Sequence, residues 1–353
     1  MRVCPRDRRV SAYHCPVALV KTTRKHKVFH LGAAGRSKLG TTLVSRRMTE
    51  PEPSSESQTL LSIIIAVYND WAPLEQCLRS LAEQKNAVSF EVIIVDDGST
   101  EAAPQSILHW SERYPLTLIR LPHAGISSAR NRGVQLSKGA VLVFVDADSM
   151  LQANCLTVLA SKIADSPRHN YFQLHLTGDR VGIVGRAEEL RLAMLQEHML
   201  QPDGRIRYLN TAAFAIRRAA IDVDKGVFDP VALRAEDTFL MASLMQRGEL
   251  PLFVADATVQ HAIPLSLIQC LQKDLRSIYL EAQTYELISS KGIKFRLSHR
   301  ERLAMLRSMW KASGQMSLGR GAWLVVTGRQ GLRLVAAYLY RGLRRLGLDS
   351  FNR

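Results

Sequence analysis

The feature that most constrains the fold is a series of apolar runs, each followed by a segment with helical spacing. The runs are rich in β-branched residues: "LLSIIIAV" (60–67), "FEVIIVD" (90–96), "LTLIRL" (116–121) and "AVLVFVD" (140–146). After the first run, Leu74, Cys77, Leu78 and Leu81 recur at the spacing of one helix face. Continuous apolar strands separated by helices are typical of a parallel sheet covered on both faces. We therefore predict an α/β fold with a Rossmann-like, mostly parallel sheet flanked by helices.

Polar side chains follow the predicted strands at their carboxyl ends. They are Tyr68, Asn69, Asp96, Asp97, Asp146 and Asp148. In open parallel sheets, ligands bind outside the carboxyl ends of the strands. The sequence therefore predicts a ligand site along this one edge of the sheet.

The pair Asp146 and Asp148 indicates a metal ion. Residues two apart in an extended segment point the same way, and two close carboxylates raise each other's pKa unless a cation lies nearby. A hard divalent ion such as Mg²⁺ or Mn²⁺, shared with substrate phosphates, fits these oxygen ligands. Alternatively, one aspartate caps the following helix and the other is solvated, which an isolated pattern this short would favour.

The charge of the chain is concentrated at its two ends. The formal net charge is +15, but residues 1–47 alone carry +11, and residues 302–348 carry +9 with no acidic residue. The remainder is mildly acidic, so we do not expect the body of the protein to bind nucleic acid. Five scattered cysteines without metal-ligand spacing favour a reducing compartment, and we expect a cytoplasmic protein.

The composition divides the chain into three regions. Residues 1–58 are predicted to form a disordered basic extension and linker, with a true start possibly at Met48 or, less favoured, an Arg-rich targeting segment. Residues 59–264 are predicted to form the α/β domain. Residues 265–353 are predicted to form a C-terminal helical region. The longest apolar stretches near the C-terminus are interrupted by Arg329 and Arg333, so no membrane-spanning helix is expected.

Five motifs together resemble the family-2 glycosyltransferases. They are "SIIIAVYND", "VIIVDDGST", "GISSARNRGVQLSKG", "VFVDADS" and "KGVFDPVALRAEDTFLMASLMQRG", and they span about residues 60 to 262. The resemblance implies the GT-A fold and an inverting, metal-dependent transfer of a sugar from a nucleotide-sugar donor. Two positions depart from the family pattern, Ser149 and Val227, and neither removes a required group.

The resemblance also implies which residues bind the nucleotide. Tyr68 resembles the side chain that packs on the base, with Ala66, Val67 and Asn69 beside it. Asp97 resembles the acid that accepts a hydrogen bond from the base, expected to be uracil, and Asp96 supports that turn. Arg130 and Asn131 are expected at the ribose or phosphate. Tyr68 could instead be a core residue, and Arg130 a solvated helix residue.

The same resemblance places the catalytic acid–base chemistry in "RAEDTFL". An inverting transfer requires a base that takes the proton of the acceptor hydroxyl, while the metal stabilises the departing phosphate. Asp237 resembles that base and Glu236 its neighbour, and both also suit the first turn of a helix. His261 is expected near the metal or diphosphate, although a lone histidine at a strand end is more often structural.

The acceptor is the least defined partner. The Q-x-x-R-W motif of processive synthases is absent from the sequence, so we expect a single transfer to a saccharide or a lipid-linked envelope glycan. Its binding residues should lie between about 170 and 235. A haloacid-dehalogenase-like phosphatase with Asp146 as nucleophile and a non-catalytic nucleotide-sugar-binding protein are the alternatives.

The C-terminal tail has the pattern of an amphipathic helix. Leu332, Val335, Leu339, Leu343 and Leu346 share one helical face, opposite Arg329, Arg333, Arg341 and Arg344. Such a helix can lie in an anionic membrane interface, which would place the protein on the inner face of the cell membrane. The alternative is that the apolar face docks on the catalytic domain.

Overall fold

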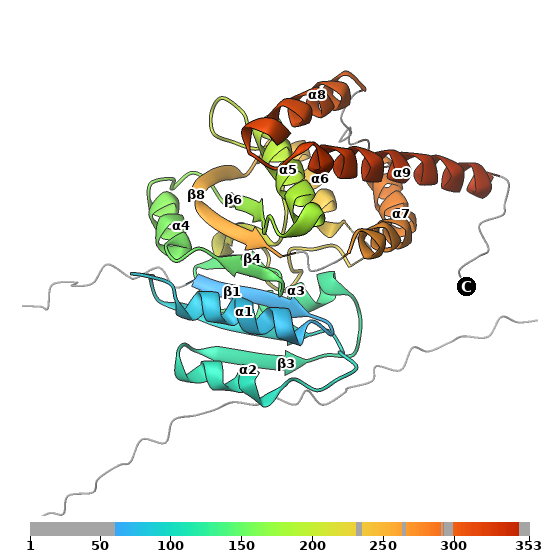
Figure 1. Cartoon of the computed structure of the whole chain (residues 1–353). Helices are drawn as coiled ribbons and strands as arrows, with labels where there is room; N and C mark the ends of the chain where they lie inside the picture. Colours follow the sequence, from blue (N-terminus) through green and yellow to red (C-terminus); the bar gives the residue numbers. More distant parts are fainter. Residues whose placement is uncertain (1–60, 231–234, 263–265, 291, 293–298, 346–353) are drawn as a thin grey trace, which may run out of the picture.

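The computed structural model describes residues 61–230, 235–262, 266–290, 292 and 299–345. Within these residues, one eight-stranded sheet has the order β3-β2-β1-β4-β7-β6-β8-β5 (Figure 1). The predicted basic extension and Leu346 lie outside the described residues.

The first half of the sheet is parallel, as predicted. β1 (Leu61–Val67) lies between β2 (Phe90–Asp96) and β4 (Val141–Val145), and β3 (Leu116–Arg120) pairs with β2. The connections are α1 (Trp71–Ala82), α2 (Gln105–His109) with η1 (Trp110–Glu112), and α3 (Ile126–Leu136). Alternate strand residues point to opposite faces, so Ile63 and Ile65 enter one core and Ile64 enters another.

The second half of the sheet mixes directions. β7 (Ala213–Arg217) pairs antiparallel with β4 and with β6 (Tyr171–Gly178). β8 (Leu252–His261) pairs parallel with β6 and antiparallel with the short β5 (Ser149–Leu151). α4 (Cys155–Ala164), α5 (Gly182–Met199), η2 (Arg218–Ala220) and α6 (Glu236–Arg247) complete this half.

Three further helices follow the sheet, as predicted for a C-terminal helical extension. They are α7 (Leu267–Ser290), α8 (His299–Gln315) and α9 (Arg320–Arg345). α8 and α9 pack on α5 through a separate apolar cluster, which consists mainly of Ala187, Leu190, Met194, Met309, Ala312, Leu318, Ala322 and Val326. The outer helices are therefore attached to the sheet through α5.

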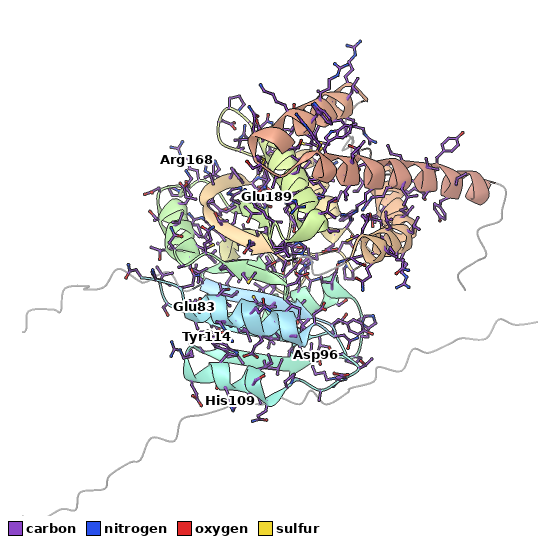
Figure 2. The ribbon with its side chains drawn as sticks, in the orientation of Figure 1. Glu83, Asp96, His109, Tyr114, Arg168 and Glu189 are labelled. Atoms are coloured by element: carbon purple, nitrogen blue, oxygen red, sulfur yellow. The ribbon has the colours of Figure 1, made fainter. Side chains whose placement is uncertain are left out.

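The carboxyl ends of the parallel strands meet at one edge of the sheet. Asp96 lies at the end toward which β3 points, and Glu83, after α1, lies at the opposite end (Figure 2). The turn after β2 closes tightly because Gly98 has a φ of +77° and a Cβ there would lie 2.7 Å from the His123 backbone nitrogen. This close approach brings the segment before α3 against the carboxyl end of β2.

Candidate active site

The predicted metal ligands come together. One ligand atom each from Asp146, Asp148 and His261 lies within 4.8 Å of the others. The register between β5 and β8 aligns Ser149 with His261, which brings the imidazole to the carboxylates. These are oxygen and imidazole donors, a set that fits a divalent metal ion.

The two aspartates reach each other through a turn and not through the extended segment that we expected. β4 ends at Val145, and the Ser149 backbone nitrogen donates a hydrogen bond to the Asp146 backbone oxygen at 3.1 Å. Neither aspartate caps a helix, because the next helix, α4, begins at Cys155 after Asn154. The capping alternative is therefore wrong.

Asp148 and His261 form an ion pair, with His261 Nε2 3.2 Å from Asp148 Oδ2. Burial favours the neutral form of each group, but the contact outweighs it. It lowers the pKa of Asp148, with a smaller contribution from the charge of Lys273, and raises the pKa of His261. A metal ion requires a charged carboxylate and a neutral imidazole, so its binding would replace this contact and release a proton from His261.

Arg130 connects the metal group to α6. Its guanidinium is 2% exposed and donates to Asp146 Oδ1 at 2.6 Å and to Glu236 Oε1. The solvated interpretation of Arg130 is therefore wrong. One buried cation holds two predicted site acids in place, from the end of β4 and from the first turn of α6.

Asp237 is the acid next to this ion pair, and it has no arginine partner of its own among the contacts described for it. Its Oδ1 accepts the Thr238 backbone N–H at 2.6 Å. Burial, followed by the charge of Glu236, raises the pKa of Asp237 to about 7. A carboxylate with such a pKa can accept a proton near neutral pH, as a general base must.

Tyr68 lies at the other end of the same edge, 42% exposed. Its ring contacts the His123 ring with a centroid distance of 4.5 Å. His123 Nδ1 lies 3.0 Å from Asp97 Oδ2, and Asp97 also accepts the Ala124 and Gly125 backbone N–H groups at 2.9 and 3.0 Å. Tyr68 is thus no core residue, and the buried Asp97 already holds the loop before α3.

The other residues predicted to bind the nucleotide make contacts within the protein itself. Asn69 Oδ1 accepts the Thr100 N–H at 2.8 Å, and Asp96 Oδ1 accepts the Ser99 N–H at 2.8 Å. Asn131 donates to the Phe228 carbonyl oxygen at 2.6 Å. Ala66 and Val67, at the end of β1, are partly and fully buried. These residues shape the edge of the sheet, and their contacts with a nucleotide stay predictions.

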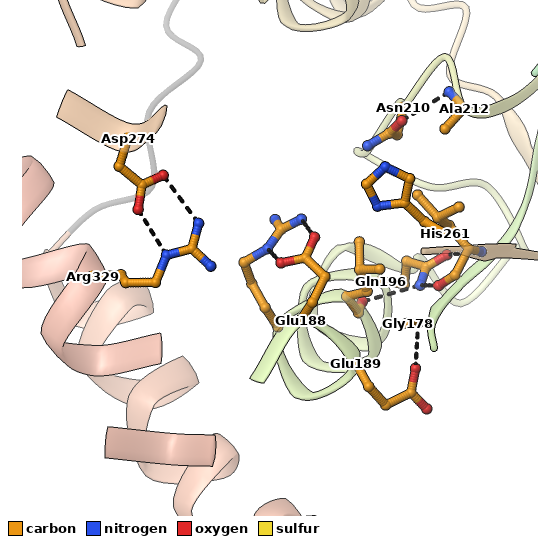
Figure 3. Close-up of polar contacts among 12 residues, drawn as sticks. Gly178, Glu188, Glu189, Gln196, Asn210, Ala212, His261, Asp274 and Arg329 are labelled. Carbon is orange, nitrogen blue, oxygen red and sulfur yellow. Dashed lines mark hydrogen bonds and ion pairs between the residues drawn. The ribbon is translucent and has the colours of Figure 1, made fainter. Parts of the chain in front are cut away.

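Glu188 and Arg191 on α5 form an ion pair that the sequence analysis missed. Arg191 Nε donates to Glu188 Oε2 at 2.8 Å. Although burial opposes the charge, Arg191 lowers the pKa of Glu188 to about 2. The charges of His261 and Arg329 also act on Glu188, and Figure 3 shows Glu188 between those two residues. The i, i+3 spacing was a usable signal, but such pairs are common on helix surfaces.

Two further residues near the site, His123 and Lys273, belong to no motif that the sequence analysis identified. His123 precedes "AGISSAR", and only the fold places it on Tyr68. Lys273 on α7 lies close enough for its charge to act on Asp70 and Asp148.

A cavity of about 510 Å³ lies elsewhere, against the later turns of α6, and its lining includes Tyr171, Asp222, Ser243 and Arg247. That cavity holds none of the individually predicted site residues, but most of its lining lies in the range of about 170 to 235 where acceptor residues are expected.

Residues 62–223 match the family model described as Glycosyl transferase family 2. YibD of Escherichia coli K12, named as an uncharacterized glycosyltransferase, is 39% identical over 93 residues, 26% of this chain and 27% of that protein. Glycosyltransferase GlyA of Streptococcus pneumoniae serotype 4 is 32% identical over 133 residues, 34% of this chain and 19% of that protein. The aligned region thus spans about a fifth to a quarter of these relatives.

A solved structure shows the same fold. The mannosyltransferase PcManGT of Pyrobaculum calidifontis, in complex with GDP-Man and Mn²⁺, superposes with a TM-score of 0.52 at 16% sequence identity. The superposition covers 83% of this chain and 89% of that chain. It therefore includes strands of both halves of the sheet and reaches beyond the residues matched by the family model.

Proposed function

Residues 62–223 form a family 2 glycosyl transferase domain with the GT-A fold, and we propose that the protein transfers a sugar from a nucleotide-sugar donor to an acceptor hydroxyl with inversion. One observation carries this proposal. The buried Arg130 joins a metal-ligand group at the end of β4 to an α6 terminus where Asp237 has a pKa raised to about 7 by burial and by Glu236. In this proposal, the metal site that stabilises the leaving group and the general base thus lie together.

The donor nucleotide is proposed to lie along the edge from Tyr68 to Asp146, with its base on the exposed Tyr68 ring. Asp97 accepts the Nδ1–H of His123 in this arrangement, so a neutral His123 offers Nε2 as an acceptor. An acceptor at this position suits a base with a ring N–H, such as uracil. Cytosine and adenine lack that hydrogen, whereas guanine carries one. The motifs that resemble the family favour uracil, so a UDP-sugar is the expected donor.

The metal ion is proposed to be Mn²⁺ or Mg²⁺, held by Asp146, Asp148 and His261. When bound, such an ion neutralises negative charge on the diphosphate leaving group. The imidazole favours Mn²⁺ over Mg²⁺, because Mg²⁺ prefers oxygen ligands. The Mn²⁺ in the Pyrobaculum mannosyltransferase complex is consistent with this choice.

The proposed chemical step is a single displacement at the anomeric carbon. The acceptor oxygen forms the new bond to that carbon while the bond to the diphosphate oxygen breaks on the opposite face, which inverts the configuration. The proton of the acceptor hydroxyl moves to an Asp237 carboxylate oxygen. Glu236 is occupied by Arg130, so its role is to fix Asp237 and to raise its pKa.

The acceptor is proposed to be a saccharide or a lipid-linked envelope glycan that receives one sugar. Glu188, Arg191 and Tyr208 lie within the range where acceptor residues are expected, and the charge of Asp237 acts on both Arg191 and Tyr208. Charged and hydroxyl groups of this kind suit hydroxyl-rich ligands. We place the reaction in the cytoplasm, since Cys77, Cys155 and Cys270 are buried free thiols.

A screen of nucleotide sugars by thermal shift, with and without Mn²⁺, tests the donor and the metal together. A ligand that binds only the folded state raises the apparent Tm by mass action. We expect UDP-sugars to raise Tm only with the ion present, and Asp148→Asn to remove that shift. Equal shifts with CDP-, GDP- and UDP-sugars would contradict the base assignment.

The two alternatives give different results with the same protein. A phosphatase with Asp146 as nucleophile would release inorganic phosphate and form an acyl-phosphate that can be trapped. A non-catalytic binding protein would show the thermal shift but no sugar transfer or donor hydrolysis. The match over residues 62–223 and the raised pKa of Asp237 favour transfer over both.

A further inference from the structure

α9 carries an apolar stripe that faces solvent. Leu334, Val335, Tyr338 and Leu339 are 54%, 58%, 78% and 58% exposed, and Leu324, on the same helical face, is 61% exposed. The side chains lie at steps of one, three and four, so they project together from the second half of the helix. Contiguous exposed apolar surface of this kind marks a binding surface.

The opposite face of α9 is fixed to the body of the protein. Ala322 and Val326 are buried in the cluster with α5 and α8. Arg329 donates to both Asp274 oxygens on α7 at 2.7 and 3.1 Å, and Arg333 donates to Asp274 Oδ1 at 3.1 Å. The helix therefore cannot turn its exposed stripe inward without breaking these buried ion pairs.

This arrangement changes the amphipathic face expected from the sequence. Arg329 and Arg333 were predicted to lie on the solvated basic face, but they pair with Asp274. The docking alternative does not hold for Val335 and Leu339, which are exposed, because the helix packs on the protein through its opposite face, with Ala322 and Val326. Leu346 and the side chains of Arg341, Leu343 and Arg344 lie outside what the structure describes.

α8 extends the surface at the start of α9. Its exposed side chains there include Leu303, Arg307, Trp310 and Lys311. Trp310 contacts Trp323 of α9 edge to face at 4.9 Å, and the Arg320 guanidinium lies 4.0 Å from the Trp310 ring centroid. Arg320 lies on the same helical face as Leu324. In Figure 1, α8 and α9 form the side of the molecule away from β3 and α2.

We propose that this α8–α9 face binds the surface of an anionic membrane, with α9 lying in the interface. Trp and Tyr side chains suit the boundary between lipid and water, and basic side chains suit anionic headgroups. Arg307, Lys311 and Arg320 are exposed basic residues of this face, and residues 302–348 contain no acidic residue, so two copies of this face would repel each other. Among the described residues, no helix is long and apolar enough to cross a membrane.

Vesicle flotation of the full chain tests this proposal, which needs no nucleotide sugar and so stands apart from the proposed function. We expect binding to vesicles containing phosphatidylglycerol, weak binding to pure phosphatidylcholine, and loss of binding as salt is raised. The double variant Leu334→Gln/Tyr338→Gln keeps the charge and removes the apolar contacts. Its partition coefficient should fall by at least about tenfold.

Two further variants separate the contribution of the apolar stripe to membrane binding from that of the basic residues. Ile268→Gln on α7 alters a side chain that is 69% exposed but lies outside the stripe, and it should bind as the unchanged protein does. Arg307→Gln/Lys311→Gln should weaken binding to anionic vesicles only. Circular dichroism melts confirm that each variant is folded.

Three results would overturn the proposal. The first is that the folded protein fails to float with phosphatidylglycerol vesicles. The second is that Leu334→Gln/Tyr338→Gln binds as well as the unchanged chain, or no worse than Ile268→Gln. The third is that light scattering shows a dimer that the double variant dissociates, which would assign the stripe to a second copy of the chain.

Discussion

The two halves of the molecule position their polar groups in different ways. In residues 61–151, which we propose bind the donor and call the donor half, Asp96 and Asp97 follow a strand end and are held by backbone N–H groups, as Asp97 is by Ala124 and Gly125. The metal-group residues Asp146 and Asp148 are instead held by ion pairs that reach this half from Arg130 and from His261. In the acceptor half, residues 171–345, charged groups are held by ion pairs such as Glu188 with Arg191 and Asp274 with Arg329. Backbone anchors follow from the fold, whereas side-chain pairs depend on which residues are present.

The strongest test of this comparison separates donor binding from turnover. Asp148→Asn should abolish metal-dependent donor binding, because it removes a charged ligand from the metal group. Asp237→Asn should leave donor binding nearly intact and lower kcat by roughly 10²-fold or more, because the general base is lost. Isothermal titration with donor and a steady-state transfer assay measure the two effects.

Asp165→Asn, an exposed acid after α4 and outside both halves, serves as the control and should change neither value. Full transfer activity in Asp237→Asn would show that the base assignment is wrong.

The next largest effect concerns the contact that joins the halves. Arg130→Met should lower the free energy of unfolding by about 3 to 5 kcal/mol, because it leaves Asp146 and Glu236 without their buried partner. Urea denaturation measures the change. Arg132→Met, on the same helix and hydrogen-bonded to the neighbouring Gln135, should cost far less. Equal costs for both would mean that Arg130 does not couple the halves.

A pH profile tests the raised pKa in the acceptor half. Asp237 acts as a base only when deprotonated, so kcat should rise about tenfold per pH unit below its pKa and level off above about 7. Donor binding at saturating metal should not follow this curve near pH 7. A rate that is flat from pH 5 to 7 would count against Asp237 as the titrating base.

A smaller effect should distinguish acceptor recognition. Glu188→Gln weakens the ion pair with Arg191 and should lower kcat/KM for the acceptor by about tenfold, with little change in donor affinity. The exposed pair Asp203 and Arg205 provides a control, because Asp203→Asn should leave both values unchanged. A loss of donor affinity alone would show that Glu188 acts in donor binding and not in acceptor recognition.

The smallest effect is expected at the N-terminus. Deleting residues 1–47 should leave Tm and transfer activity unchanged, because the segment carries +11 and no hydrophobic periodicity. Calorimetry and the transfer assay check this. Reduced activity in the shortened protein would extend the functional site beyond both halves.

The donor half was predictable because its strands are continuous apolar runs and its polar residues follow them directly. Asp146 and Asp148 were predicted as metal ligands from that position together with the family motifs around them. The pairing of Arg130 with Glu236 could not, because 106 residues separate them and no local pattern encodes the contact. β6 and β7 were also not assigned, since their antiparallel pairing joins Tyr171 with Ile216 across α5. His123 was missed because its role depends on the turn at Gly98.

The Arg130 contact also has a consequence for synthesis of the chain. At about 5 to 20 residues per second, the ribosome delivers Glu236 roughly 5 to 20 seconds after Arg130. During that interval, Asp146 is the only one of the two acidic partners of Arg130 that has been synthesised. The strands β1 to β4 can pair early, but the second hydrogen-bonding nitrogen of the guanidinium finds its acid only when α6 docks. Folding of the parallel strands should therefore precede formation of a competent site.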